Sequence, residues 1–491
     1  MLLLGIDIGT SSIKVSVIDA ASQNIIASAQ HPETESEIIS LQKGWAEQSP
    51  VQWWNDVQIA IKKVNASGKY NPSDIGAIGI AYQMHGLVLI DQQGQVLRDS
   101  IIWCDSRAVP YGEAAYAAIG KEKCLTHLLN SPGNFTAAKL AWVKENEPKI
   151  FDQIDKILLP GDYISYRLTG QVTTSASSLS EGIFWDFKNN TLSADVLNYF
   201  GFKESMFPKI QDVFSEHGLL TKHIADTIGL KQGIPVTYKA GDQPNNALSL
   251  NVLNEGEFAA TAGTSGVIYG VSNQLVYDNE TRINSFAHVN HTNTKTRTGV
   301  LLCINGTGIM NRYVKQLAGS DLSYTEMNEQ ASKVNVGSDG LHILPFGNGA
   351  ERIFNNNIVG AHFEHIDLNK HTKAHFFRAA QEGIAFAFKY GFDIMKSNGM
   401  NPTMIRAGKA NMFLSNIFTE AFVNVIGVPI ELYEADGSAG AAKGAGIGFG
   451  FYASAEEACS IQKTLGVIEP TNLSLYQDLY HEWNQTLSTH I

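Results

Sequence analysis

Cysteine is scarce in this chain, which has four in 491 residues. They lie far apart, at Cys104, Cys124, Cys303 and Cys459, and no two form a Cys-x-x-Cys pair. Structural zinc sites and disulfide frameworks depend on closely spaced or more numerous cysteines, so the sequence favours neither. Reduced thiols in a cytoplasmic protein are the simplest interpretation.

Long apolar runs and an excess of basic residues are missing as well. No run of 18 apolar residues occurs, and the N-terminus lacks the basic region of a secretion signal, so we expect no membrane segment. The 36 Lys and Arg residues against 48 Asp and Glu residues give a net charge of −12. Because non-specific nucleic-acid binding depends on cations that contact phosphates, we expect no nucleic-acid partner.

The composition instead describes a soluble globular protein with ample material for its core. Hydrophobic residues make up 44% of the chain and charged residues 17%. A chain of 491 residues exceeds what one hydrophobic core normally spans, so more than one domain is expected. Short apolar runs that suit buried strands alternate with helical patterns, which indicates an α/β fold.

The first eighteen residues after Met1 form the stretch on which the functional interpretation depends. Residues 2–19 are two apolar strands around a Gly-Thr-Ser turn, with Gly9 at the bend and Asp7 in the turn. Glycine allows the backbone N–H groups and the nearby hydroxyls to approach an anion closely. These hydroxyls belong to Thr10, Ser11 and Ser12. A carboxylate beside phosphate is favourable when a divalent cation lies between them, so the turn predicts a site for Mg²⁺ and a nucleotide. The alternative is an ordinary hairpin with a polar turn.

A second copy of this pattern occurs at residues 256–270. Gly263, Thr264 and Ser265 align with the first Gly-Thr-Ser turn, while Thr261 stands opposite Asp7, so one copy alone carries the acid. Two such hairpins could hold one polyphosphate from both sides. The duplication predicts two similar domains that face each other across a cleft, at residues 1–247 and 248–491.

Polar groups follow two further apolar segments in the first half. Gln83, Met84 and His85 follow Tyr82 at the end of the strand expected at residues 75–81, and Asp242 follows a strand and Gly241. Ligands of α/β proteins meet the sheet at such strand ends. The structural alternatives are a histidine satisfied within the core and, for Asp242, a helix N-cap. Residues 173–180, rich in Ser and Thr, are expected to form a loop.

A small-residue turn late in the chain is a weaker signal. Residues 407–411 are expected to open a helix, whose N-terminal N–H groups would suit a phosphate or nucleotide.

The order of these features resembles that of the sugar kinases in the superfamily of actin, heat-shock chaperones and hexokinase. More closely, the chain resembles the FGGY carbohydrate kinases, and among them the xylulose kinases, from residue 1 to about residue 450. The motifs that carry the resemblance are GIDIGTSSIK at 5–14, WAEQSPVQWW at 45–54, QMHG at 83–86, IWCDSR at 102–107 and TAGTSGV at 261–267.

The resemblance implies a fold and a set of roles. It implies two duplicated actin-like (ribonuclease H-like) ATPase domains, ATP and Mg²⁺ as cofactors, and transfer of phosphate to a small-molecule sugar, D-xylulose. Asp242 would be the catalytic base and Asp7 would serve Mg²⁺ and phosphate. Met84 and His85 would contact the sugar, in a pocket shaped also by Gln83, Trp103 and Asp105. The ATP-binding residues would be Thr10, Ser11, Ser12, Lys14, Gly263, Thr264, Ser265, Gly408 and Asn411.

Some questions stay open at this level. Ribulose, fuculose, glycerol and gluconate are alternative substrates, and a chaperone-like or filament-like ATPase is an alternative class, because fold alone does not decide function. The late glycine turn keeps only Gly408 of the family's three glycines, so the nucleotide preference is not assigned. The resemblance also allows a homodimer.

Overall fold

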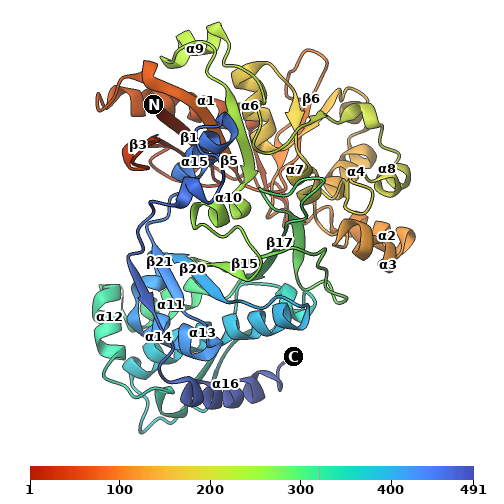
Figure 1. Ribbon diagram of the computed structural model, residues 1–491. Helices are drawn as coiled ribbons and strands as arrows, with labels where there is room; N and C mark the ends of the chain where they lie inside the picture. Colours follow the sequence, from red (N-terminus) through yellow and green to blue (C-terminus); the bar gives the residue numbers. More distant parts are fainter. Residues whose placement is uncertain (320) are drawn as a thin grey trace.

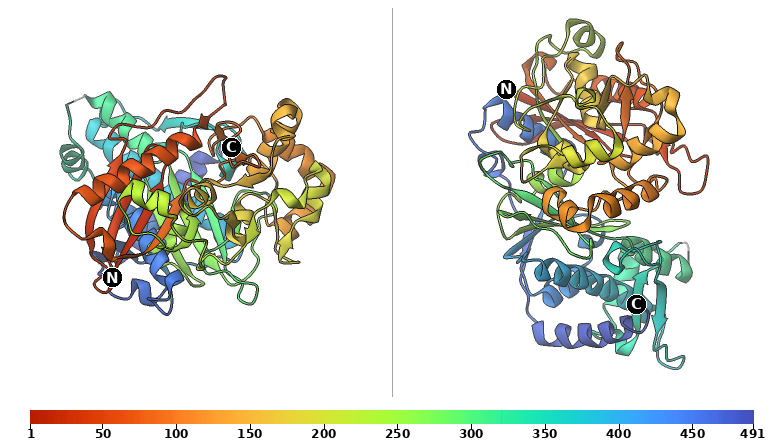
Figure 2. Two further views of the ribbon diagram at one scale, coloured as in Figure 1. Left: turned by 90° about the horizontal axis from the view of Figure 1, so that it is seen from above. Right: turned by 90° about the vertical axis from the view of Figure 1, so that its right-hand side faces the viewer.

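The computed structural model describes residues 1–319 and 321–491. The chain forms two α/β halves stacked along the long axis of the molecule, each built on its own sheet (Figures 1 and 2). The first sheet has the order β13-β5-β1-β2-β3. Its strands are β1 (Leu2–Ile8), β2 (Ile13–Asp19), β3 (Ile25–His31), β5 (Ile75–Tyr82) and β13 (Val236–Gly241).

The second sheet repeats this arrangement and extends it at both edges. Its order is β16-β17-β15-β14-β20-β21-β22. The strands are β14 (Glu257–Ala262), β15 (Gly266–Ser272), β16 (Asn284–Ala287), β17 (Thr298–Ile304), β20 (Met404–Gly408), β21 (Ile430–Tyr433) and β22 (Gly466–Ile468).

The two sheets share one topology around their hairpins. β1 pairs with β2 in antiparallel and with β5 in parallel orientation, and β14 pairs in the same way with β15 and β20. The next strand on the parallel side, β13 or β21, is parallel as well. The predicted duplication of an α/β domain is therefore confirmed.

Helix α1 (Pro50–Ala66) covers the outer face of the first sheet together with α6 (Pro160–Thr169). Pro50 opens α1, since its fixed φ suits the first helical turn and its missing N–H would have no partner there. Ser49 is the N-cap residue but makes no side-chain capping bond. Trp53 and Trp54 are buried against the sheet.

The opposite face of the first sheet is covered by α15 (Gly437–Phe449), which comes from near the end of the chain (Figure 1). Its small residues allow very close packing. A Cβ on Gly5 would lie 1.8 Å from the Ser438 carbonyl oxygen, and one on Gly79 would lie 2.0 Å from that of Ala441. α10 (Asp242–Ser249) contacts both α15 and the second sheet, so these two helices lie between the two sheets.

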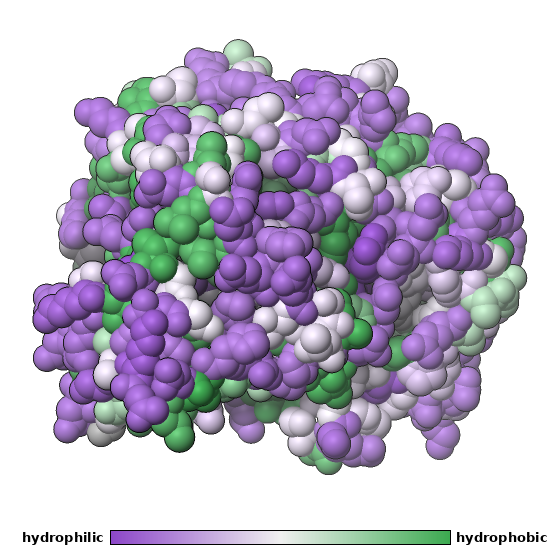
Figure 3. Space-filling view, turned by 90° about the horizontal axis from the view of Figure 1, so that it is seen from below, coloured by the Kyte–Doolittle hydropathy of each residue, from purple (hydrophilic) through white to green (hydrophobic). Residues whose placement is uncertain are grey.

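The second half has the larger core. Helices α11 (Gly308–Ala318), α13 (Lys373–Ser397) and α14 (Asn416–Ile426) cover one face of its sheet, and α16 (Leu473–Leu487) packs outside them. The end of the molecule seen in Figure 3 is mostly hydrophilic, with its apolar side chains in separate groups.

A helical lobe extends from the side of the first half, and it contacts the second sheet (Figure 1). It contains α2 (Val109–Ile119), α4 (Thr136–Asn146), α7 (Ala176–Glu181) and α8 (Ala194–Phe200). The loop predicted for residues 173–180 is wrong, because Ser175 caps α7 by accepting a hydrogen bond from the Ser178 N–H. Ser177 and Ser180 then bind the backbone of Ala287 in β16 at 2.7 and 2.9 Å.

The structure also bears on two absences in the sequence. All four cysteines are free thiols. Within residues 1–319 and 321–491, no helix combines the length and apolar character that a membrane span requires.

Candidate active site

Three parallel strands of the first sheet end at the same edge. Ile8 of β1 lies opposite Tyr82 of β5, which in turn lies opposite Gly241 of β13. The residues that follow these strands are the first Gly-Thr-Ser turn, the Gln83–His85 segment and Asp242. The sheet therefore brings together three groups that are distant in the sequence.

Asp7 lies within β1, where it pairs with Lys14 in the register of the hairpin, so its predicted position in the turn is wrong. Its carboxylate lies against the start of α15, because a Cβ on Gly437 would be 2.1 Å from Asp7 Oδ2. Burial and the neighbouring Asp436 raise the pKa of Asp7 to about 6, although Lys14 opposes this effect.

Asp242 is the first residue of α10, and Gly241 is the N-cap, so Asp242 is not the capping residue of this helix. Burial, and after it the charge of Asp7, raise the pKa of Asp242 to about 7. The two carboxylates are thus close enough to repel each other in one weakly solvated space. The charge of Asp242 also contributes, less than burial does, to the raised pKa of Cys303 on β17 of the second sheet.

His85 has an unusual backbone conformation, with φ of 64°, and a fixed ring. Its Nδ1 lies 2.9 Å from the Glu181 carbonyl oxygen, and its ring packs edge-on against Phe135 at 4.9 Å and beside Phe286 at 5.4 Å. Burial lowers the pKa of His85 to about 3, so the imidazole is neutral. With Nδ1–H donated to the carbonyl, Nε2 is left as a hydrogen-bond acceptor.

Met84 and Glu181 lie beside the catalytic candidate Asp242. A Cβ on Gly241 would meet Met84 Cγ at 2.6 Å and Glu181 Oε2 at 2.9 Å. Glycine at this position therefore lets an apolar and a polar side chain approach the start of α10 together.

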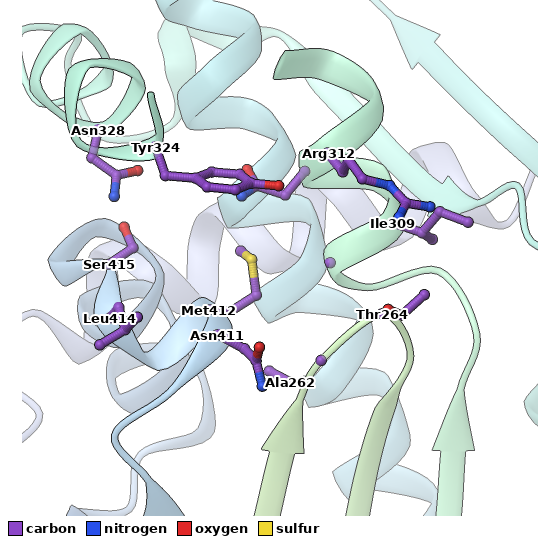
Figure 4. A pocket seen from close by; sticks show the side chains of 13 residues that line it. Ala262, Thr264, Ile309, Arg312, Tyr324, Asn328, Asn411, Met412, Leu414 and Ser415 are labelled. Carbon is purple, nitrogen blue, oxygen red and sulfur yellow. The ribbon is translucent and has the colours of Figure 1, made fainter. Parts of the chain in front are cut away.

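A separate pocket of about 370 Å³ lies against the second hairpin (Figure 4). The Gly263 and Thr264 carbonyls accept hydrogen bonds of 2.9 and 3.1 Å from the N–H groups of Gly308 and Ile309, which fix the hairpin against the start of α11. The pocket is lined by Ala262, Gly263, Thr264, Gly308, Ile309, Asn311, Arg312, Tyr324, Asn328, Asn411, Met412, Leu414 and Ser415.

Comparison with known proteins identifies the family. The family model described as the N-terminal domain of the FGGY family of carbohydrate kinases matches residues 2–249. The chain belongs to this family. It is an ATP-dependent sugar kinase.

Individual relatives agree with this family assignment. The xylulose kinase of Staphylococcus xylosus is 30% identical over 405 residues, which are 81% of this chain and 80% of the relative. The crystal structure of the "xyloylose kinase" of Brucella ovis has a TM-score of 0.90 and 25% identity, and covers 100% of this chain and 99% of its own. The Plasmodium falciparum glycerol kinase with ADP has the same fold, with a TM-score of 0.90 and 22% identity over 100% and 98% of the two chains.

Of the residues predicted to bind ATP, three line the pocket of this kinase: Gly263, Thr264 and Asn411. Ser265 and Gly408 are not among the lining residues. The prediction that residues 407–411 open a helix is wrong, because a short 3-10 turn at Asn411–Leu414 intervenes and α14 starts only at Asn416.

Several residues of the pocket were not found from the sequence. In Figure 4, Tyr324 and Arg312 lie on one side of the pocket, and Asn411 and Met412 lie opposite them. Arg312 comes from α11, and Tyr324 opens α12 (Tyr324–Ala331). Neither belongs to a recognisable motif, and only the packing of these helices brings them to the hairpin.

The remaining groups of the first hairpin are held by neighbouring elements. The Thr10 hydroxyl donates to Gln83 Oε1 at 3.2 Å and accepts from Trp103 Nε1 at 2.9 Å. Lys14 Nζ lies 2.5 Å from Oδ2 of Asp436, the N-cap of α15. The hairpin is closed by a 3.1 Å bond from the Gly9 N–H to the Ser12 carbonyl, while Ser11 is exposed.

The polar groups of Gln83 and Asp105 are already hydrogen-bonded to other residues of this chain. Gln83 is 1% exposed, and its Nε2 donates to Gln48 Oε1 at 2.9 Å. Asp105 is fully buried, and its carboxylate accepts from Arg107 and from the Ala46 N–H. Their contacts support the positioning of the Thr10 turn and of the Trp103 segment. Trp103 itself is 51% exposed.

Two buried charged side chains beside His85 were also missed by the sequence analysis. Lys139 on α4 donates from Nζ to the His85 carbonyl at 2.8 Å, and burial lowers its pKa to about 7. Burial raises the pKa of Glu181 well above its ordinary value, and the nearby Tyr82 hydroxyl opposes this effect. An ionisable residue in a helical or loop segment carries no sequence signal of its burial. Only the tertiary structure could therefore reveal that Lys139 and Glu181 are buried.

Proposed function

We propose that this kinase transfers the γ-phosphate of ATP to the terminal hydroxyl of D-xylulose and forms D-xylulose 5-phosphate. The observation that supports the proposal most strongly is the placement of Asp242, which lies near enough to Asp7 for that charge to raise its pKa and directly follows Gly241, against which Met84 packs. The relatives named xylulose kinases favour this sugar among the family's substrates.

Asp7 is suited to serve a divalent cation such as Mg²⁺. Its carboxylate and that of Asp242 are enclosed and close together, and the nearby Lys14 is already paired with Asp436. Two carboxylates without a dedicated counter-charge are a donor set that hard cations prefer. When bound, Mg²⁺ would neutralise charge on the ATP phosphates.

The side chains of this protein would contribute alignment and a proton acceptor. The Asp242 carboxylate takes the proton of the sugar's terminal hydroxyl as that oxygen attacks the γ-phosphorus and ADP leaves. With a pKa of about 7 it is basic enough for this transfer near neutral pH. The neutral His85 accepts a hydrogen bond from a sugar hydroxyl, and Met84, Phe135 and Phe286 cover the carbon chain.

The two halves would hold the nucleotide between them. The N–H groups and hydroxyls of the first turn contact the terminal phosphates, and the pocket beside Thr264 takes the rest of the nucleotide. Because Phe286 and Arg352 reach the surroundings of His85 from the second half, the sugar pocket is completed only when both halves are present. Exclusion of water from this space would protect the γ-phosphate from hydrolysis.

A coupled assay of ADP release tests the proposal. D-xylulose, ribulose, fuculose, glycerol and gluconate are compared at matched concentrations, with and without Mg²⁺. We expect D-xylulose to give the highest kcat/KM and Mg²⁺ to be required. A higher kcat/KM for another sugar or polyol would identify that compound as the substrate instead of D-xylulose. ADP release that does not depend on any of these compounds would favour an ATPase of the chaperone type.

A further inference from the structure

Three metal-ligating side chains meet at the outer edge of the second half. His362 and Glu364 lie two residues apart on β19 (Gly360–Glu364), on the same face of the strand. His490 lies beyond the end of α16, near the terminus marked C in Figure 2. One ligand atom from each of the three lies within 4.8 Å of the others, and no other such group of three is found in residues 1–319 and 321–491.

The contacts of His362 fix which of its nitrogens faces the cluster. Nε2 lies 2.9 Å from the Val359 carbonyl oxygen, which can only accept, so Nε2 carries the proton. Nδ1 therefore keeps its lone pair, and it points to Glu364 Oε1 at 3.8 Å. A ligating histidine that donates its other N–H to a backbone carbonyl is the usual arrangement around protein-bound metals.

The distances between the ligand atoms of the three side chains suit coordination of one shared ion better than a set of direct hydrogen bonds. The 3.8 Å between Nδ1 and the carboxylate is too long for a hydrogen bond, but ligands about 2.1 Å from one ion lie roughly 3–4 Å apart. His490 Nε2 lies 3.2 Å from the same Oε1. The two imidazoles lie close together, with 3.8 Å between centroids and 31° between their planes. The exposed fractions of the three side chains, 23 to 34%, leave access for an ion and for water.

We propose that His362, Glu364 and His490 bind one divalent transition-metal ion of the zinc class. Two imidazoles and one carboxylate favour Zn²⁺, Co²⁺ or Ni²⁺ over Mg²⁺, which prefers oxygen ligands and retains its water. The ion joins β19 to the segment after α16, two parts of the chain that are far apart in sequence. The site is separate from the pocket of Thr264, since none of its residues lines that pocket.

A neighbouring layer of side chains holds the same two segments in place. Thr486 on α16 contacts His342 Nδ1 at 2.9 Å and His365 Nε2 at 3.4 Å. α16 also packs on β18 (His342–Phe346), the antiparallel partner of β19. The ligands are thus presented by elements that are docked independently of the ion, which lowers the ordering needed on binding.

The test uses the full untagged chain after treatment with a chelator. Zn²⁺ binding is titrated by calorimetry in buffer with millimolar Mg²⁺, and thermal unfolding is followed with and without Zn²⁺. We expect one Zn²⁺ per chain and a Tm that rises with Zn²⁺ concentration, because an ion that binds only the folded state stabilises it. Co²⁺ in place of Zn²⁺ should give the visible absorption of a site of low coordination number.

Two ligand variants and one matched control identify the site. His362→Gln and His490→Gln should each weaken Zn²⁺ binding by more than about tenfold. The control His481→Gln removes a histidine of α16 whose Nε2 lies 2.9 Å from Gln485 Nε2, away from the three proposed ligands, and it should bind Zn²⁺ as the wild type does. Sugar-kinase turnover should be unchanged in all three, which shows that they fold. Absence of stoichiometric binding, or unchanged affinity in both ligand variants, would overturn the proposal.

Discussion

At the scale of single residues, the site is governed by ionisable groups held in weakly solvated surroundings. Burial and Asp436 raise the pKa of Asp7, burial and Asp7 raise the pKa of Asp242, and burial shifts His85 and Lys139 toward their neutral forms. Such perturbed groups gather where charge must be moved or received. Two consequences can be measured.

The first concerns the proposed base. Asp242→Asn keeps the shape of the side chain but removes its capacity to accept a proton. We expect kcat to fall by about 10²–10⁴-fold while KM for the sugar changes little. Steady-state kinetics on D-xylulose measures both values, and Asp74→Asn, an exposed change at residues 72–74, serves as the control. Full activity of Asp242→Asn would remove this residue from the role.

The second concerns the buried Lys139. Its pKa is about 7 in the folded protein and about 10.4 when unfolded, so between these values the unfolded state binds more protons. The free energy of unfolding of the wild type should therefore rise from pH 7 to pH 9, by about 1–2 kcal/mol relative to Lys139→Met. Urea denaturation at several pH values measures this difference.

A second lysine of the same helix provides the control for that measurement. Lys144→Met removes a partly exposed side chain of α4, and its stability curve should run parallel to that of the wild type. If the stability curve of Lys139→Met is also parallel to that of the wild type, Lys139 is charged at neutral pH and the inference that burial lowers its pKa is wrong.

At the scale of elements, the contact between α15 and the first sheet determines the surroundings of Asp7 and Lys14. α15 carries Asp436 and Gly437 to Lys14 and Asp7, and it can do so because glycines on both elements let the backbones touch. The helix thus sets the position of the hairpin as well as covering the sheet.

A pair of glycines in one strand tests this contact. Gly79→Ala would place a methyl group 2.0 Å from the Ala441 carbonyl oxygen, so either α15 or β5 must move. We expect a loss of at least about 2 kcal/mol in the free energy of unfolding, together with reduced kcat/KM. Gly76→Ala, in the same strand, meets only the flexible Met1 side chain and should cost far less. Equal effects of both changes would contradict this interpretation.

At the scale of the whole molecule, the first half is not built from one continuous segment of the chain. The family model ends at residue 249, but α15, at Gly437–Phe449, completes the first sheet. The predicted boundary between residues 247 and 248 stays a prediction, and the return of α15 means that the core of the first half includes a segment from beyond it. The chain crosses between the halves three times, through α10, through the segment before α15 and through the segment between α15 and β22.

This connectivity predicts the behaviour of an isolated fragment. Residues 1–249 without α15 would expose the inner face of the sheet, including Leu3 and Tyr238, which are fully buried in the whole chain. We expect the fragment to bind a hydrophobic dye and to lack the near-ultraviolet circular dichroism of a packed core. Fusion of residues 435–450 through a flexible linker should restore that signal, whereas fusion of residues 416–426 should not. A packed and cooperative fragment without α15 would refute the prediction.

Local patterns determined much of this protein. Alternating apolar strands around Gly9 and Gly263 predicted both hairpins and the duplication, because a tight turn between strands has a signature within a few residues. The loop predicted over residues 173–180 failed, since Ser and Thr serve as caps as readily as they serve as loop residues.

Only the tertiary structure decided how these parts meet. The sequence places Asp7 and Asp242 in one reaction by resemblance, but their mutual repulsion arises from three strands that end at one sheet edge. Burial of Lys139 and Glu181, the engagement of Gln83 and Asp105 with protein partners, and the approach of Tyr324 to the second hairpin depend on contacts between distant segments. The physical reason is that turns and caps are stabilised by neighbours in the chain, whereas burial and charge coupling are set by neighbours in space.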